Sequence, residues 1–182
     1  MDYSKITADP VRGPEIGKLY MDASPFITTL ARVAYRQFVD QVAEQFFALV
    51  DDGLKIRFRD YDPYADAREM FTDVGKGWLA VWSTPEEQGH PVLSARSNNM
   101  FRAVHDYHGH YMTGRDFSRH GEEAAWVRHS QMFTGLARRA MTTETRGQNS
   151  AFIWVNGGRK FPQQKAVLLP DWVSDIPERW QS

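Results

Sequence analysis

SPFITTLARVAYRQFVDQVAEQFFALVDDG, residues 24–53, is the stretch that decides the fold of this chain. Its apolar residues recur at the three- and four-residue spacing of one helix face: Phe26, Leu30, Val33, Ala34, Phe38, Val42, Phe46, Leu49 and Val50. Ser24 followed by Pro25 is typical of an N-cap and a first helical position, and the Asp-Asp-Gly sequence at 51–53 is typical of a helix end. The pattern predicts one long helix that serves as the main packing element.

Two short strands are predicted after this helix. Leu54, Ile56 and Phe58 alternate with charged residues, which is the period-two pattern of a half-buried strand. Residues 78–82 (WLAVW) form a second apolar run, and residues 64–76 between the two have helical spacing. We expect the two strands to pair as one small antiparallel sheet.

The second half of the chain is expected to be mainly helical. Its apolar spacing favours three helices, over residues 97–112, 119–134 and 135–149. Residues 1–23 hold prolines and glycines among mixed residues, which predicts an irregular N-terminal arm. We therefore expect an α+β fold in which residues 24–182 form a predominantly helical single globular domain that binds a metal.

Composition narrows the classes of function. A net charge of −1 removes the usual electrostatic reason for binding nucleic acid, so we expect a small-molecule substrate instead. The absence of cysteine excludes disulfides, thiolate metal ligands and a cysteine nucleophile. No apolar run approaches the roughly 18 residues of a membrane span, and the first residues have no apolar signal core. These features predict a cytoplasmic protein without a membrane segment.

Five of the six histidines lie between His105 and His129, and three of them fall in the motif HDYHGH at 105–110. Imidazole is the commonest neutral metal ligand in proteins, and nearby carboxylates complete sites for hard metals. His105 and His110 are five residues apart, about 140° round an ideal helix. They can meet at one ion only where the helix is distorted, and Gly109 is the residue where we expect that distortion.

Carboxylates follow on the next two predicted helices. Glu144 lies among small residues on a core-packed helix, where a buried acid needs a cation or an arginine partner. A salt bridge with Arg139 or Arg146 is the alternative to metal binding. Glu122 and His129 are seven apart on about one helix face. They are equally compatible with an acid near a helix N-terminus and a histidine packed at a helix interface.

The motif HDYHGH resembles the His-Glu-Leu-Leu-Gly-His iron motif of the aromatic amino acid hydroxylases, with the same spacing and the same glycine. In that family the two histidines and a later glutamate form a 2-His-1-carboxylate triad on Fe(II). The resemblance implies that His105, His110 and Glu144 are the metal ligands. It is confined to this segment, and Asp106 stands where the family has glutamate. No residues for a pterin cofactor or an aromatic amino acid can be matched.

Our leading hypothesis is a mononuclear non-haem Fe(II) oxygenase or hydroxylase, with Zn or Mn as alternative metals. Asp106 or His129 would contact a ligating side chain and orient it. Arg146 would complete the catalytic group and would line the substrate side with Gln148 and Asn149, where a guanidinium suits a carboxylate or phosphate.

Two other functions fit the sequence. The adjacent His105 and Asp106 look similar to metal-dependent phosphohydrolases of the HD-domain type. Such an enzyme would need His90 and a downstream aspartate such as Asp171 as further ligands. Alternatively, the histidines and acids form a structural network or a partner-binding surface in a protein that is not an enzyme.

Overall fold

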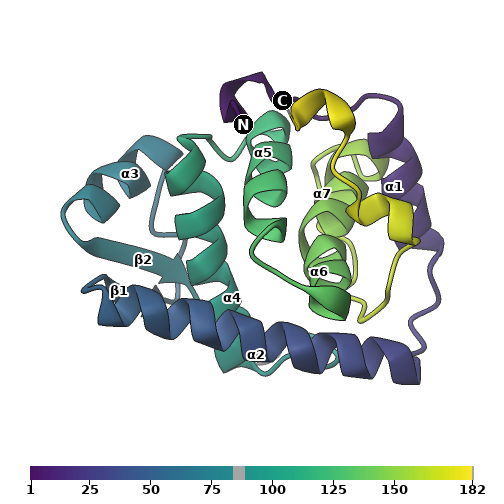
Figure 1. The fold of residues 1–182 in the computed structure, drawn as a ribbon, viewed down its shortest axis with the longest axis horizontal. Helices are drawn as coiled ribbons and strands as arrows, with labels where there is room; N and C mark the ends of the chain where they lie inside the picture. Colours follow the sequence, from purple (N-terminus) through teal and green to yellow (C-terminus); the bar gives the residue numbers. More distant parts are fainter. Residues whose placement is uncertain (84–88, 182) are drawn as a thin grey trace.

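A computed structural model of the protein describes residues 1–83 and 89–181. The long helix α2 (Thr29–Asp51) runs along one side of the molecule and packs against α4 (Ala95–His105) and α6 (Gly135–Thr142) (Figure 1). The predicted long helix is confirmed, but it begins five residues after Ser24. Thr28 is the N-cap, because its hydroxyl accepts a hydrogen bond from the backbone N–H of Ala31 at 3.1 Å.

One face of α2 supplies much of the core. Its buried residues are Ala31, Ala34, Tyr35, Phe38, Val42 and Leu49. Phe38 packs on Phe101 of α4 and on Phe133, which precedes α6, with ring centroids 4.9 and 5.5 Å apart. Of the nine residues predicted for this face, Ala34, Phe38, Val42 and Leu49 are buried, whereas Phe26, Leu30, Val33 and Val50 are exposed.

The two strands form a parallel sheet, so the predicted antiparallel pairing is wrong. Strand β1 (Lys55–Arg59) pairs with β2 (Trp78–Trp82), from Lys55 opposite Trp78 to Arg59 opposite Trp82. The connection between them contains α3 (Ala67–Gly75). A helical crossover returns the chain to the same end of the sheet, and this makes the second strand parallel to the first.

The second half of the chain is helical, as predicted. Helix α4 continues into a π-helical turn over Asp106–His110 and a 3₁₀ turn over Tyr111–Thr113. Helix α5 (Arg119–Ser130) then returns alongside it (Figure 1). After α6 the chain continues through a π-helical turn, the short α7 and another π-helical turn: Thr143–Gly147, Gln148–Ser150 and Ala151–Val155. The predominantly helical α+β fold with one small sheet is confirmed.

The N-terminal region is not the irregular arm that the sequence predicted. After a 3₁₀ turn at Tyr3–Lys5, it contains helix α1 (Arg12–Asp22). Asp9 caps the turn that leads into this helix, because its carboxylate accepts from the backbone N–H groups of Val11 and Arg12 at 2.9 and 3.0 Å. Pro14 lies in the first turn of α1, where a backbone N–H would have no partner within the helix, so proline is tolerated there.

Helix α1 packs against the later helices and against the C-terminal segment. Ile16 and Tyr20 form a small second core with Val167, Leu169 and Val173. The C-terminal segment has no regular secondary structure over residues 161–170 and then forms 3₁₀ turns at Asp171–Ser174 and Glu178–Trp180. None of the helices within the described residues has both the length and the apolar character needed to cross a bilayer.

Candidate metal centre

The π-helical turn at the end of α4 brings His105 and His110 together. Within it the backbone N–H of Tyr111 donates to the carbonyl oxygen of Asp106, five residues earlier. Residues five apart therefore come close to one face, as they would not in a regular α-helix. The two imidazole ring centroids lie 5.1 Å apart. The predicted distortion between the two histidines is confirmed.

Gly109 allows a close approach between this turn and α5. A Cβ atom at Gly109 would lie 3.0 Å from the Cβ atom of Ala125 and 3.3 Å from the ring of His105. Gly109 does not have a positive φ, so its backbone conformation is open to other residues. The glycine is needed here for space, and not for the backbone freedom that the sequence suggested.

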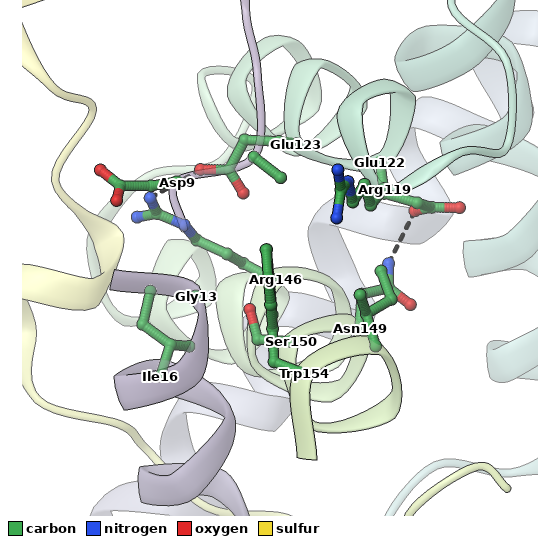
Figure 2. A pocket seen from close by; sticks show the side chains of 12 residues that line it. Asp9, Gly13, Ile16, Arg119, Glu122, Glu123, Arg146, Asn149, Ser150 and Trp154 are labelled. Atoms are coloured by element: carbon green, nitrogen blue, oxygen red, sulfur yellow. Dashed lines mark hydrogen bonds and ion pairs between the residues drawn. The ribbon is translucent and has the colours of Figure 1, made fainter. Parts of the chain in front are cut away.

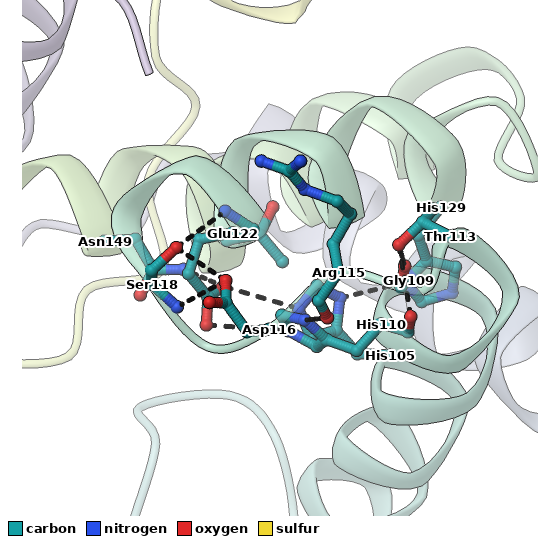
Figure 3. A network of polar contacts seen from close by, with 12 residues as sticks. His105, Gly109, His110, Thr113, Arg115, Asp116, Ser118, Glu122, His129 and Asn149 are labelled. Carbon is teal, nitrogen blue, oxygen red and sulfur yellow. Dashed lines mark hydrogen bonds and ion pairs between the residues drawn. The ribbon is translucent and has the colours of Figure 1, made fainter. Parts of the chain in front are cut away.

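Glu122, in the first turn of α5, faces both histidines (Figure 3). Nε2 of His105 lies 3.7 Å from Oε2 of Glu122, and Nε2 of His110 lies 3.5 Å from Oε1. One ligand atom from each of these residues lies within 4.8 Å of the other two. Bonds of about 2.1 Å to one ion would place neighbouring ligand atoms about 3.0–3.4 Å apart. The observed spacing is therefore close to that of a metal site.

Hydrogen bonds made by Nδ1 of His105 and Nδ1 of His110 leave the other ring nitrogen, Nε2, facing Glu122. Nδ1 of His110 donates to the carbonyl oxygen of Arg115 at 3.1 Å. Nε2 of His129 donates to Oε1 of Gln45 at 2.8 Å, which leaves its Nδ1 to accept from Nδ1 of His105 at 3.3 Å. Each neutral imidazole then presents the lone pair of Nε2 toward the carboxylate. Lone pairs that face a carboxylate repel it unless a proton or a cation lies between them.

In the absence of a metal, a proton on His110 can compensate the charge of Glu122. Burial would raise the pKa of Glu122, but His110 and His105 hold that pKa well below its usual range. Burial would lower the pKa of His110, but the charge of Glu122 outweighs burial and raises the pKa. The amide of Asn149 also donates to Oε2 of Glu122 at 2.6 Å. Glu122 is thus held as a carboxylate, the form that binds metals.

Glu144, which the sequence predicted as the third ligand, is bound by other partners. Nδ1 of His90 accepts from the backbone N–H groups of Val92 and Leu93, so Nε2 carries the ring proton. That Nε2 donates to Oε1 of Glu144 at 3.1 Å, and the hydroxyl of Tyr35 donates to the same oxygen. The structure places Glu122, and not Glu144, with the two histidines.

Arg146 also differs from its predicted role on the substrate side. Its Nη2 donates to Oε1 of Glu123 at 2.6 Å, and its Nη1 donates to the carbonyl oxygen of Val173 at 2.8 Å. These partners come from α5 and from the C-terminal segment, and Arg146 has no place in the wall of the large cavity at the histidines. One hydrogen bond joins Arg146 to α5, and the other joins it to the C-terminal segment.

The other predicted site residues are at or near the cluster. His129 is fully buried behind His105, where its hydrogen bond orients the ring, as expected for a residue that positions a ligand. Asp106, Gln148 and Asn149 line the cavity beside the histidines. Burial raises the pKa of Asp106, although the charge of His110 opposes this shift.

Glu122 could have been identified from the sequence, because it lies as far after the turn between the two helices as His110 lies before it. Helices joined by a short loop run antiparallel, so residues equally far from the turn face each other. Asp116 lies between the two helices, six residues after His110 and six residues before Glu122. A Cβ atom at Gly121 would lie 1.7 Å from the carbonyl oxygen of Asp116, so only glycine allows this tight return.

A cavity of about 500 Å³ opens beside the cluster, within the size range of small-molecule sites. Its aromatic lining consists of Tyr64, Trp82, Phe101, Phe117 and Phe161. Its polar lining includes carboxylates, amides and one guanidinium: Asp62, Asp106, Glu122, Glu144, Asn98, Gln148, Asn149, Gln164 and Arg102. The three candidate ligands also lie in its wall, so a bound ion would be accessible to a molecule in the cavity.

A second pocket lies between α1 and α5, around Arg146 and Asp9 (Figure 2). Its volume is about 20 Å³, which is room for one water molecule. Of these two pockets, only the larger has room for a substrate. Comparisons of the chain with family models, with curated proteins and with solved structures give no match.

Proposed function

We propose that the protein is a mononuclear non-haem Fe(II) enzyme, an oxygenase or hydroxylase, with His105, His110 and Glu122 as its metal ligands. The observation that carries the proposal is the convergence of two imidazole Nε2 lone pairs and one carboxylate at the wall of the cavity. Two histidines and one carboxylate are the ligand set of the Fe(II) facial triad, which leaves positions open for oxygen and substrate. Bound iron would supply the activation of oxygen.

The residues around the ligands support this assignment. Gln45 and His129 hold the ring of His105, the carbonyl group of Arg115 holds that of His110, and Asn149 holds Glu122. Such partners orient metal ligands and fix the tautomers of ligating histidines. Asp106, whose raised pKa favours the protonated acid, would hold or release a proton in the cavity.

The phosphohydrolase alternative has less support. His90, which it would need as a ligand, is engaged with Glu144 through Nε2 and with backbone N–H groups through Nδ1. Asp171 pairs with Arg139 at the surface, where its side chain is 83% exposed. The arginine expected to bind a phosphate, Arg146, is held by Glu123. We therefore favour the iron enzyme.

Metal analysis of protein purified without a histidine tag and loaded anaerobically with Fe(II) tests the proposal. We expect about one iron per chain in the unaltered protein and loss of iron in the variants H105A, H110A and E122A. His108→Ala is the matched control, since it removes a histidine from the same motif that is not part of the cluster. Circular dichroism should show all four variants folded.

Two results would contradict the proposal. One is a folded E122A variant that keeps its iron while E144A loses it, because Glu144 would then be the third ligand. The other is an unaltered protein that takes up no Fe(II) and whose stability does not respond to chelators. A preference for Zn²⁺ over Fe(II), without oxygen consumption in the presence of a reductant, would point instead to a hydrolase.

A further inference from the structure

Glu144 has one carboxylate oxygen that is paired within the protein and one that is open to the large cavity. Its side chain lines the cavity and is 5% exposed. Oε1 accepts from the hydroxyl of Tyr35 and from Nε2 of His90, and neither of these residues lines the cavity. Oε2 accepts no hydrogen bond from the residues that the structure describes, yet it is not among the covered atoms that lack a partner. Oε2 is therefore accessible to solvent, and the cavity is the space that Glu144 lines.

The two partners of Glu144 bring no positive charge. Nδ1 of His90 accepts from two backbone N–H groups, so a second proton has no place on that ring and His90 is neutral. Burial, and then the charge of Glu144, raise the pKa of Tyr35, which therefore stays a neutral donor. Among the described residues, no lysine or arginine forms an ion pair with Glu144. A buried carboxylate without a cation is destabilising, and a cationic ligand at Oε2 would offset that cost.

The other charged groups of the cavity wall already have partners. Glu122 faces the two histidines of the metal cluster. The carboxylates of Asp106 and Asp62 act on the guanidinium of Arg102, which is the only guanidinium or ammonium group among the described residues of the lining. This leaves Glu144 as the carboxylate of the wall whose charge no cation compensates. A ligand that brings a positive charge would therefore be attracted to Glu144, whereas an anion would be repelled.

The walls of the cavity favour an apolar body on such a cation. Tyr64 precedes α3, Trp82 ends β2 and Phe101 lies on α4, so aromatic side chains enter the cavity from separate elements. Phe117 and Phe161 are 42% and 59% exposed, which places them at the rim. Aromatic rings pack against apolar groups, and their faces also attract cations. A cationic ligand with an apolar body would thus have partners both at Oε2 and along the walls.

We infer that this cavity binds a protonated amine with an apolar body, whose N–H group donates to Oε2 of Glu144. The ammonium group would supply the cation that Glu144 lacks, and the apolar body would lie against the aromatic side chains. As the class of substrate, the inference rests on the proposed function. The binding itself uses no metal, so it can be measured on metal-free protein.

Calorimetric titration of chelator-treated protein with three probes of similar size tests the inference. 2-Phenylethylamine carries the ammonium group, 2-phenylethanol has an uncharged hydroxyl in its place, and 3-phenylpropanoate carries a carboxylate. We expect the amine to bind, the alcohol to bind about tenfold more weakly, and the carboxylate to bind more weakly still or not at all. Absence of amine binding to the folded protein would overturn the inference, as would equal or tighter binding of the alcohol or the carboxylate.

Two carboxylate variants locate the site. Glu144→Gln keeps an acceptor for Tyr35 and His90 but removes the charge, so it should weaken amine binding about tenfold and leave the binding of 2-phenylethanol unchanged. Asp62→Asn is the matched control, since it removes an exposed carboxylate from the wall of the same cavity. It should weaken amine binding less than about threefold. Unchanged amine affinity in folded Glu144→Gln protein would overturn the inference, as would equal weakening in the two variants.

Iron content measured on the same proteins separates this inference from the proposed function. The Glu144 and Asp62 variants should keep their iron, because neither residue belongs to the metal cluster. Iron loading without amine binding would overturn the inference and leave the proposed function standing. Amine binding in a protein that loads no iron would contradict the proposed function and leave the binding site standing.

Discussion

Glu122 and Glu123 are neighbours on α5, yet they have opposite surroundings. Glu122 faces the imidazoles of His105 and His110 and the amide of Asn149 (Figure 3). Glu123 points to the other side of the helix, where the guanidinium of Arg146 lies 2.6 Å from its carboxylate (Figure 2). Both side chains are largely buried, at 21% and 9% exposed. They differ in the partners that compensate their charge.

The difference separates a structural acid from the acid that we propose as a metal ligand. An arginine stays protonated at every pH at which proteins fold, so the charge of Glu123 is always compensated. Arg146 also packs on the ring of Trp126, 3.9 Å from its centroid, and this fixes its position. The partners of Glu122 carry charge only when they bind a proton or a cation. Glu122 is thus the acid whose charge is compensated only when a proton or a cation is bound.

The largest expected effect comes from breaking the arginine pair. Arg146→Met leaves Glu123 buried without a counter-charge, which should lower the free energy of unfolding by about 3–5 kcal/mol. Glu122→Gln in metal-free protein should lower it by less than this, because His105 and His110 can release their protons and no buried charge is then left behind. Urea unfolding followed by circular dichroism measures both values.

The double variant E123L/R146M is the control for this prediction. It removes both charges, so most of the lost stability should return. If Arg146→Met alone were as stable as the unaltered protein, the pair would not be the structural element that the comparison requires. If Glu122→Gln were the more damaging change in metal-free protein, the two acids would have exchanged roles.

The sequence predicted the parts of the site that depend on local spacing. The five-residue interval between His105 and His110 cannot fit one face of a regular helix, and the π-helical turn resolves that conflict as expected. The apolar face of residues 24–53 likewise predicted α2. Its start was misplaced because Thr28 forms a side-chain cap that Ser24, in a local turn, does not provide.

The rest of the site depends on contacts between distant residues. Glu144 has the partners Tyr35 and His90, which lie 109 and 54 residues away in the chain. Local sequence gives no sign of such partners, so the sequence alone predicts a metal ligand at this buried glutamate. The parallel sense of the sheet follows from the crossover through α3, which the predicted helix at 64–76 already implied.

The second largest effect is expected on metal affinity, from the hydrogen bonds that connect Gln45 through His129 to His105. Gln45→Leu removes the acceptor for Nε2 of His129, so the tautomer that leaves Nε2 of His105 free is no longer fixed. We expect Fe(II) to bind about 10–100-fold more weakly. Competition with a chelator of known affinity measures the change.

Gln41→Leu is the matched control for Gln45. It lies one turn earlier on α2 and hydrogen-bonds to Thr134, far in sequence from the metal motif. Its iron affinity should stay unchanged, although some stability should be lost. Equal weakening in both variants would mean that packing of α2, and not the histidine tautomer, controls the metal.

A smaller effect is expected from Glu144→Gln. The glutamine keeps one carbonyl acceptor for Tyr35 and His90 but loses the charge that strengthens these hydrogen bonds. The free energy of unfolding should fall by about 1–2 kcal/mol, while the iron content stays the same. Loss of iron from this variant would instead return Glu144 to the position of third ligand.

The smallest effect is expected from Asp9, whose carboxylate caps the turn before α1 near the pair of Glu123 and Arg146. Its contribution to the free energy of unfolding should depend on pH. Burial alone would raise the pKa of Asp9, but the backbone N–H of Arg12 and the guanidinium of Arg179 lower it from 3.8 to about 2. Because the folded pKa is the lower one, the stabilisation is complete above about pH 5 and is lost as the pH falls toward 2. Asp9→Asn should therefore cost about 1 kcal/mol at pH 7. Urea unfolding at several pH values should show the difference between the two proteins shrinking below pH 4, whereas a constant difference would mean that the charge of Asp9 has no part in the cap.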